Sequence, residues 1–209
     1  MKQAFSTILI LLALASFAAA QETEYGTNDV RQFRSMRDRD FRNAALSPLL
    51  REDFVNFKGL LYFAEDEKFA VKAKLERTAD KQIFTVPTSV GTSRRYLKYG
   101  ILKFELDGKS YTLIAFQSET APKKEEYRTL LFIPFRDQTN GKETYGAGRY
   151  MDIKTPAGDE VTLNFNLAYN PSCAYGSEKY SCPLPPKENF LQVEIKAGEK
   201  NFPYTAQKK

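Results

Sequence analysis

Apolar and polar residues alternate along most of the chain after Gly59. In the clearest segment, Val71, Ala73 and Leu75 alternate with charged residues, and a period of two is typical of a β-strand with one buried face. Nine segments show this pattern clearly or weakly: 59–64, 69–75, 82–86, 102–106, 111–116, 128–135, 149–154, 161–165 and 191–195. Short, evenly spaced strands predict a mainly all-β fold, an antiparallel barrel or sandwich of about eight or nine strands.

Two turn sequences predict hairpins. Asp107-Gly108 separates the strands predicted at 102–106 and 111–116, and Asp-Gly suits a two-residue hairpin turn because both positions tolerate positive φ. Ala157-Gly158-Asp159 predicts a second hairpin, which joins 149–154 to 161–165.

The helical signal is confined to residues 27–58. Any of Thr27, Asn28 and Asp29 can cap a helix. The stripe of this helix contains Val30, Phe33, either Met36 or Arg37, and Phe41. Ser47-Pro48 then predicts the start of a second, short helix. We therefore expect an N-terminal helical arm before the strands.

The first 20 residues have the features of a secretory signal peptide. Lys2 precedes an uncharged apolar run, and Ala18-Ala19-Ala20 forms a small-residue cleavage site. The rest of the chain contains no second apolar run long enough to span a membrane. The prediction is an exported protein, periplasmic or secreted, whose residues 21–209 form a single β-rich domain.

The chain has no histidine among its 209 residues. This excludes Ser-His-Asp and Cys-His catalysis and imidazole metal sites, so an enzyme here would depend on carboxylates, Lys, Tyr or Cys. Its 31 basic and 26 acidic residues are interspersed, which is typical of a solvated surface rather than a nucleic-acid footprint. No metal, no cofactor and no nucleic-acid partner is expected, and the protein is expected to be a monomer.

Strand parity places three charged residues on apolar faces. Asp137 continues the odd, apolar positions of 131–135, Arg149 shares a face with Met151, and Glu199 continues the face of 191–197. Because inward charges need partners, we expect Arg149 to pair with Asp137, Glu199 or both. The cluster is either a structural ion pair or a ligand site, and parity alone does not decide between them.

Cys173 and Cys182 are the two cysteines of the chain. An even count in an oxidising compartment favours a disulfide, although a metal pair or a reactive thiol is the alternative. The loop around them contains Tyr169, Tyr175 and Tyr180. These tyrosines could line a binding surface or simply pack.

Several ordered motifs resemble a bacterial family of proteins of unknown function, DUF1684, over about residues 28–202. The matching motifs are Phe132–Asp137 (FIPFRD), Thr144–Tyr150 (TYGAGRY), Asn164–Pro171 (NFNLAYNP), Cys182–Asn189 (CPLPPKEN) and Ala197–Lys200 (AGEK). The resemblance implies a bacterial protein but no activity. One departure is Asn164, where the family is expected to have Asp.

The resemblance adds candidate residues to those found by parity. The combined candidate ligand-binding set is Asp137, Thr144, Tyr145, Arg149, Asn166, Asn170, Tyr175, Glu188, Asn189 and Glu199. Our first hypothesis is a β domain that binds a small molecule or glycan. The alternatives are a hydrolase of envelope glycans, with Glu188 or Glu199 as the acid and Asp137 as its partner, and a structural envelope protein without a ligand.

Overall fold

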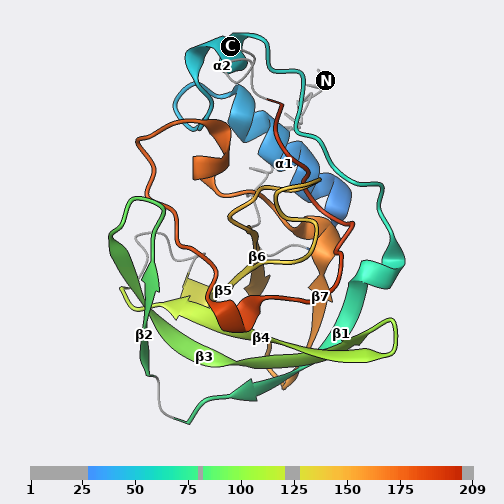
Figure 1. Ribbon diagram of the computed structural model, residues 1–209. Helices are drawn as coiled ribbons and strands as arrows, with labels where there is room; N and C mark the ends of the chain where they lie inside the picture. Colours follow the sequence, from blue (N-terminus) through green and yellow to red (C-terminus); the bar gives the residue numbers. More distant parts are fainter. Residues whose placement is uncertain (1–27, 80–81, 121–127, 204–209) are drawn as a thin grey trace, which may run out of the picture.

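The computed structural model describes residues 28–79, 82–120 and 128–203. The signal peptide predicted at residues 1–20 lies outside the described residues. Seven strands form one antiparallel sheet: β1 (Ala70–Arg77), β2 (Ile83–Pro87), β3 (Ser93–Leu106), β4 (Lys109–Ser118), β5 (Leu130–Phe135), β6 (Arg149–Lys154) and β7 (Glu160–Asn164). The protein is therefore mainly β, with seven described strands rather than the eight or nine predicted (Figure 1).

The sheet curls into a half-barrel. Its strand order is β6-β5-β4-β3-β1-β7, with β2 paired to the first part of β3. The two edge strands β6 and β7 are joined directly by residues 155–159, and so short a link reaches at most about 20 Å. The two edges must consequently approach each other, which bends the sheet around its apolar face.

The hairpin predicted between 149–154 and 161–165 is wrong. β6 pairs with β5, with Ile153 opposite Leu131, whereas β7 pairs with β1, with Val161 opposite Ala73. Alternation within a strand identifies its buried face but does not identify the neighbour that it pairs with. Here the connecting residues cross from one edge of the sheet to the other.

The hairpin predicted at Asp107-Gly108 is confirmed. Both turn residues have positive φ, 50° and 71°, as a two-residue turn of the favoured type requires. β3 begins at Ser93, well before the predicted start at 102, and bends at an irregularity between Lys98 and Gly100. A Cβ at Gly100 would lie 2.6 Å from the Glu76 carbonyl oxygen, so the close approach of β1 requires glycine there.

Two predicted strands are absent from the described residues. Segment 59–64 contributes a single bridge, from Tyr62 to Glu199. Segment 191–195 is extended but has no strand ladder, because its backbone bonds reach only isolated partners, such as Leu191 N to Arg136 O at 2.8 Å. Leu191 and Ile195 are nevertheless buried. The alternation therefore predicted which residues are buried, although the segment does not pair with a neighbouring strand.

The core fills the concave face of the sheet. On β5 and β6 the odd positions supply it, including Leu131, Ile133 and Met151. The even positions Phe132 and Tyr150 point away from this core, and Tyr150 lies against Tyr169 with ring centroids 5.8 Å apart. The sheet thus presents a second, aromatic surface to the segments that cover it.

In the described residues, two α-helices precede the sheet, α1 (Val30–Arg42) and α2 (Arg51–Val55). The start predicted for the second helix at Ser47-Pro48 is wrong, because α2 begins at Arg51, after Leu50. Of the three candidate caps of α1, Asp29 is the one used, since its side chain accepts from Gln32 N at 2.9 Å. α1 packs on the domain through a cluster of Val30, Phe33, Met36 and Leu167, so it is not a free arm. Four short 3-10 helices lie wholly within the described residues: η1 (Glu67–Phe69), η3 (Phe165–Leu167), η4 (Ser172–Tyr175) and η5 (Lys187–Asn189).

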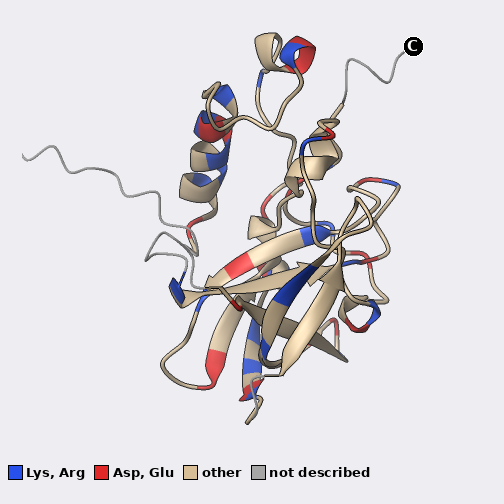
Figure 2. Cartoon of the chain, turned by 90° about the vertical axis from the view of Figure 1, so that its left-hand side faces the viewer, with Lys and Arg blue, Asp and Glu red and all other residues tan. Residues whose placement is uncertain are grey.

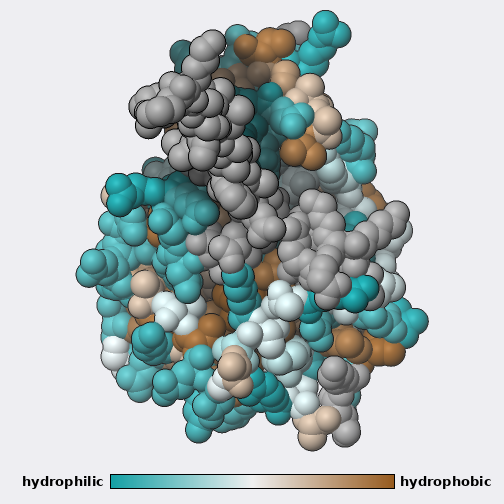
Figure 3. Space-filling view, turned by 180° about the vertical axis from the view of Figure 1, so that it is seen from behind, coloured by the Kyte–Doolittle hydropathy of each residue, from teal (hydrophilic) through white to brown (hydrophobic). Residues whose placement is uncertain are grey.

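The surface has a mixed character. Basic and acidic residues are interspersed on α1 and across the strands (Figure 2). On the face opposite that of Figure 1, hydrophobic residues form separate patches among hydrophilic ones (Figure 3). None of the helices in the described part of the chain is long and apolar enough to cross a membrane.

Candidate functional site

The first charged cluster is centred on Arg149, whose side chain is fully buried at the start of β6. Its Nη2 atom lies 2.8 Å from Asp137 Oδ2, so the predicted pairing with Asp137 is confirmed. The guanidinium also donates to the carbonyl oxygens of Ile195, at 2.9 Å, and Ala197. Burial lowers the pKa of Arg149, and Asp137 opposes that shift.

Asp137 has few lone pairs left for a ligand. Its Oδ1 atom accepts from Thr139 N at 2.8 Å, from the Thr139 hydroxyl and from Ile195 N at 3.3 Å. The pair therefore fastens the extended segment 191–199 to the end of β5 and β6. Its burial and its many partners favour a structural role, although Arg149 Nε has no hydrogen-bond partner among the described residues.

Glu199 belongs to a second cluster, in which Arg149 contacts only its backbone oxygen, at 3.4 Å. The Glu199 carboxylate instead pairs with Arg37 Nη2 at 3.1 Å and accepts from the Tyr175 hydroxyl. Asn170 donates to it twice, through N and Nδ2, each at 3.1 Å. Of the two partners expected for Arg149, only Asp137 forms the ion pair, and the cationic partner of Glu199 comes from α1.

Arg37 also connects this cluster to a partly buried acid, Asp152. Its guanidinium lies over the Tyr169 ring, 4.8 Å from the centroid, and the Tyr169 hydroxyl donates to Asp152 Oδ2. Burial raises the pKa of Asp152 to about 6, against the opposing effects of Tyr169 and Arg37. Asp152 was not among the candidate residues predicted from the sequence, although its even position on 149–154 marked it as pointing away from the core.

Two of the candidate asparagines hold the backbone. Asn166 donates to Asp66 O at 2.9 Å and accepts from Asp66 N at 3.1 Å. Asn189 accepts from Ile114 N at 2.7 Å and donates to Ile114 O and Pro134 O, at 3.0 and 2.7 Å. Asn189 thereby bridges β4 and β5 beyond the point where these strands pair.

The remaining candidates are scattered. The Thr144 hydroxyl lies 2.7 Å from that of Thr139, within the loop before β6. Tyr145 is half-buried against the Phe41 cluster, and Glu188 is exposed outside both charged clusters. Asn164 accepts from Asn166 N at 3.1 Å and so caps η3. This capping role is equally open to an Asp.

A cleft of about 490 Å³ lies beside these clusters, on the aromatic surface of the sheet. We call it the tyrosine cleft. Arg37 of α1, Arg94 and Tyr96 of β3, Phe132 of β5, Tyr150 of β6 and two loop segments, 169–172 and 179–183, line it. Its size is within the range of small-molecule sites. Of these lining residues, only Tyr169, Asn170 and Tyr180 were predicted from the sequence as part of a possible binding surface.

The tyrosine cleft carries an excess of positive charge. Arg37, Arg94 and Lys179 line it, and no Asp or Glu is among its described lining residues. Arg37 is neutralised by Glu199. Arg94 donates to Ser181 O at 2.8 Å and Lys179 lies over the Tyr180 ring, 4.9 Å from its centroid. Within the described residues, neither of these two cations forms an ion pair with a carboxylate.

A disulfide links Cys173 and Cys182, as predicted. The loop that it closes carries Lys179 and Tyr180 and forms one wall of the tyrosine cleft. Arg94 holds the same loop through Ser181. The disulfide and Arg94 together position this wall.

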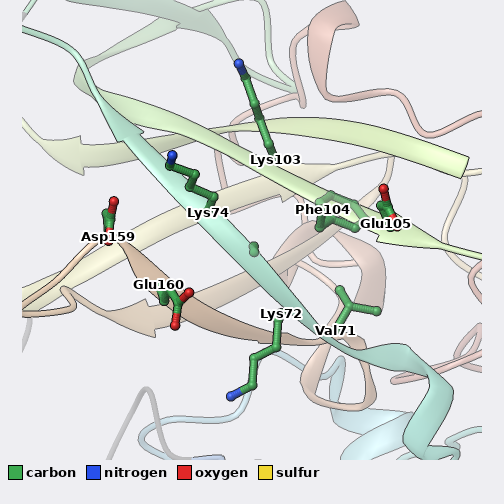
Figure 4. A pocket seen from close by; sticks show the side chains of 9 residues that line it. Val71, Lys72, Lys74, Lys103, Phe104, Glu105, Asp159 and Glu160 are labelled. Carbon is green, nitrogen blue, oxygen red and sulfur yellow. The ribbon is translucent and has the colours of Figure 1, made fainter.

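Two larger grooves, each of about 710 Å³, lie elsewhere. Figure 4 shows the one on the outer face of β1, β3 and β7, where Lys72, Lys74 and Lys103 lie near Asp159 and Glu160. Both grooves mix cations with carboxylates. In the described part of the chain, no group of three or more acidic or cysteine residues is placed to hold a metal ion.

Comparison with known proteins gives a family but no activity. The chain is similar to an uncharacterized protein of Haloarcula marismortui, whose solution NMR structure superimposes with a TM-score of 0.65. The two are 39% identical, over 82% of this chain and 91% of that one. None of the curated proteins matches significantly. Residues 55–200 match the family described as "Protein of unknown function (DUF1684)", and the chain therefore belongs to the DUF1684 family.

Proposed function

We propose that the protein is a binding domain for a small ligand with a carboxylate or phosphate group, and that the tyrosine cleft is its binding site. The observation that carries the proposal is the charge of the cleft lining. Arg94 and Lys179 lie there without carboxylate partners in the described residues. Cations with no protein counter-ion attract anions most strongly where aromatic walls exclude part of the solvent.

The aromatic lining supplies a surface for the body of the ligand. Tyr96 stacks on Phe132 with ring centroids 5.4 Å apart, and Tyr150 meets Phe132 edge to face at 4.7 Å. These contacts hold the rings in place before a ligand arrives, which lowers the ordering cost of binding. The wall suits a sugar or another ring, so an acidic sugar fits the proposal.

The geometry favours binding over hydrolysis. A glycosidase of the usual kind needs two carboxyl groups about 5–10 Å apart across the bond to be cleaved, and the described lining of the tyrosine cleft contains none. Glu199 is buried and saturated by Arg37, Asn170 and Tyr175. The hydrolase hypothesis gains no support from these residues.

Export is part of the same proposal. The disulfide between Cys173 and Cys182 supports it, because structural disulfides persist mainly in oxidising compartments. An exported domain would meet small ligands or glycan fragments outside the cytoplasm.

The charge requirement can be tested with matched sugars. Glucuronate and glucose 6-phosphate would each be titrated beside glucose, with amide chemical shifts as the readout. We expect both anions to perturb residues around 94–96 and 179–183, and glucose to do so at least tenfold more weakly. The double variant Arg94→Gln/Lys179→Gln should lose the preference, whereas Lys74→Gln on the outer face of β1 should keep it. Equal binding of glucose and the two anions would contradict the proposal.

A further inference from the structure

We propose that the tyrosine cleft is a thiol–disulfide exchange site for small anionic thiols, with the Cys173–Cys182 disulfide as the reacting group. The inference rests on the proposed function, because it specifies the bound anion as a thiol. It goes further in assigning a reaction to the cleft.

The disulfide borders the cleft through Cys182, a residue with 7% of its surface exposed. Cys182 is one of the lining residues, and Lys179 belongs to the loop that the disulfide closes. Arg94 reaches the same loop at Ser181 O, 2.8 Å away. An anionic thiol held by these two cations is therefore concentrated next to Cys182, and its thiolate form is the reactive one.

The reaction is a pair of balanced displacements. The ligand thiolate RS⁻ attacks Sγ of Cys182, the S–S bond breaks, and Cys173 leaves with the bonding electron pair as a thiolate. A second RS⁻ then attacks the ligand sulfur of the mixed disulfide, which releases RSSR and the Cys182 thiolate. Two ligand thiols are oxidised to one disulfide, the cysteine pair is reduced, and the two protons of the ligand thiols pass through solvent to the cysteines.

Groups around the disulfide are placed to stabilise both leaving thiolates. Ser89 Oγ lies 3.3 Å from Cys173 Sγ. A disulfide sulfur carries no proton, so the Ser89 hydroxyl must be the donor. The Cys173 N–H donates to Cys182 Sγ at 3.1 Å. Both bonds strengthen as negative charge develops on sulfur, which is the condition for lowering the barrier.

The decisive test compares thiols of different charge. The rate of reduction of the intact protein would be followed by mass spectrometry with glutathione, which is anionic, and with 2-mercaptoethanol, which is neutral. For each thiol, the rate with Arg94→Gln/Lys179→Gln is divided by the rate with the unchanged protein, so that intrinsic thiol reactivity cancels. We expect about a fivefold to tenfold loss for glutathione and less than twofold for 2-mercaptoethanol. Lys74→Gln should change neither rate, and 0.5 M NaCl should remove the glutathione preference.

Two further measurements distinguish a failure of the exchange site from a failure of the proposed binding function. Ser89→Ala should slow both thiols about equally, because it acts on the leaving sulfur and not on the ligand charge. S-Methylglutathione, which lacks a free thiol, is titrated by chemical shift. Binding of this analogue in the cleft without any selectivity in the reduction rates overturns the exchange site and leaves the proposed function standing. If S-methylglutathione and the sugar anions all fail to bind, both proposals fall. Circular dichroism of each variant confirms that the fold is retained.

Discussion

Arg37 of α1 donates to the Glu199 carboxylate across 3.1 Å, which joins two residues 162 positions apart in the chain. Tyr175 and Asn170 complete the shell around this carboxylate. The pair fastens α1 to the end of the β domain, and Arg37 is at the same time part of the tyrosine cleft. Any change to the pair should therefore affect stability first and the cleft second.

Glu199→Gln should lower the stability of the protein. The substitution leaves Arg37 largely buried without its counter-ion, and breaking a buried pair in this way costs about 3 kcal/mol. For a chain of this size the melting temperature should fall by roughly 10 °C. The double change Arg37→Met/Glu199→Gln should cost less than the sum of the single changes, because it removes both charges together.

Thermal melting of the four proteins of this cycle, beside Glu178→Gln as an exposed control, measures the effect. Unchanged or increased stability in Glu199→Gln would contradict the structural role and identify the carboxylate as one held under strain for function.

Asn189→Ala should destabilise the sheet between β4 and β5. The side chain satisfies Ile114 N, Ile114 O and Pro134 O in a fully buried position. Removing it leaves buried backbone groups without partners, at a cost of about 2–3 kcal/mol. Urea unfolding should show this loss. Asn201→Ala, which removes one exposed bond to Lys142 O, should cost well under 1 kcal/mol.

The disulfide should stabilise the protein and preserve the cleft. Removing it by Cys173→Ser/Cys182→Ser frees a short loop in the unfolded chain, and the expected loss is about 2–3 kcal/mol. The same variant should bind glucose 6-phosphate more weakly, because Lys179 is no longer held in the cleft wall. Retained affinity would show that Arg94 and the rest of the lining position the anion without the loop.

Strand parity predicted one charged pair correctly because Asp137 follows the end of β5 and Arg149 begins β6, its neighbour in the sheet. Phe135 and Arg149 are opposite each other in the β5–β6 register, so the faces assigned from alternation meet in space. The same reasoning failed for Glu199, because its partner Arg37 is on a helix. The way in which a helix crosses a sheet cannot be derived from the period of either element.

Most of the tyrosine cleft could not be predicted from the sequence, again because alternation within a strand does not show what packs against it. Arg94 and Tyr96 belong to the early half of β3, which was missed because basic residues there obscure the alternation. Phe132, Tyr150 and Asp152 occupy positions that alternation marks as facing away from the core, and such positions are ordinarily solvent-exposed. Phe132 and Tyr150 become walls of a cleft because Arg37 of α1 and residues 179–183 of the disulfide loop lie across this face.

The unfolding free energy should depend on pH through Asp152. The folded-state pKa of its carboxyl is about 6, well above the value of about 3.9 expected for an unfolded chain. The folded protein therefore binds this proton more tightly between about pH 4 and pH 6, so this group's contribution to stability is lost as the pH rises through that window. Asp152→Asn removes the ionisation, and should raise stability at pH 7.5 by on the order of 2 kcal/mol but have little effect at pH 4.

The quantity to measure is the difference in unfolding free energy between the unchanged protein and Asp152→Asn, because the other carboxylates titrate in both. Urea unfolding of the unchanged protein, Asp152→Asn and the exposed control Asp159→Asn should show a gap that opens between pH 4 and pH 6 only for Asp152→Asn. The variant should also bind glucose 6-phosphate more tightly at pH 7.5, because a negative charge has been removed beside Tyr169 and Arg37 at the wall of the cleft. A gap independent of pH would mean that Asp152 titrates as an ordinary surface carboxyl. An unchanged affinity for glucose 6-phosphate would show that the charge of Asp152 does not affect anion binding in the cleft.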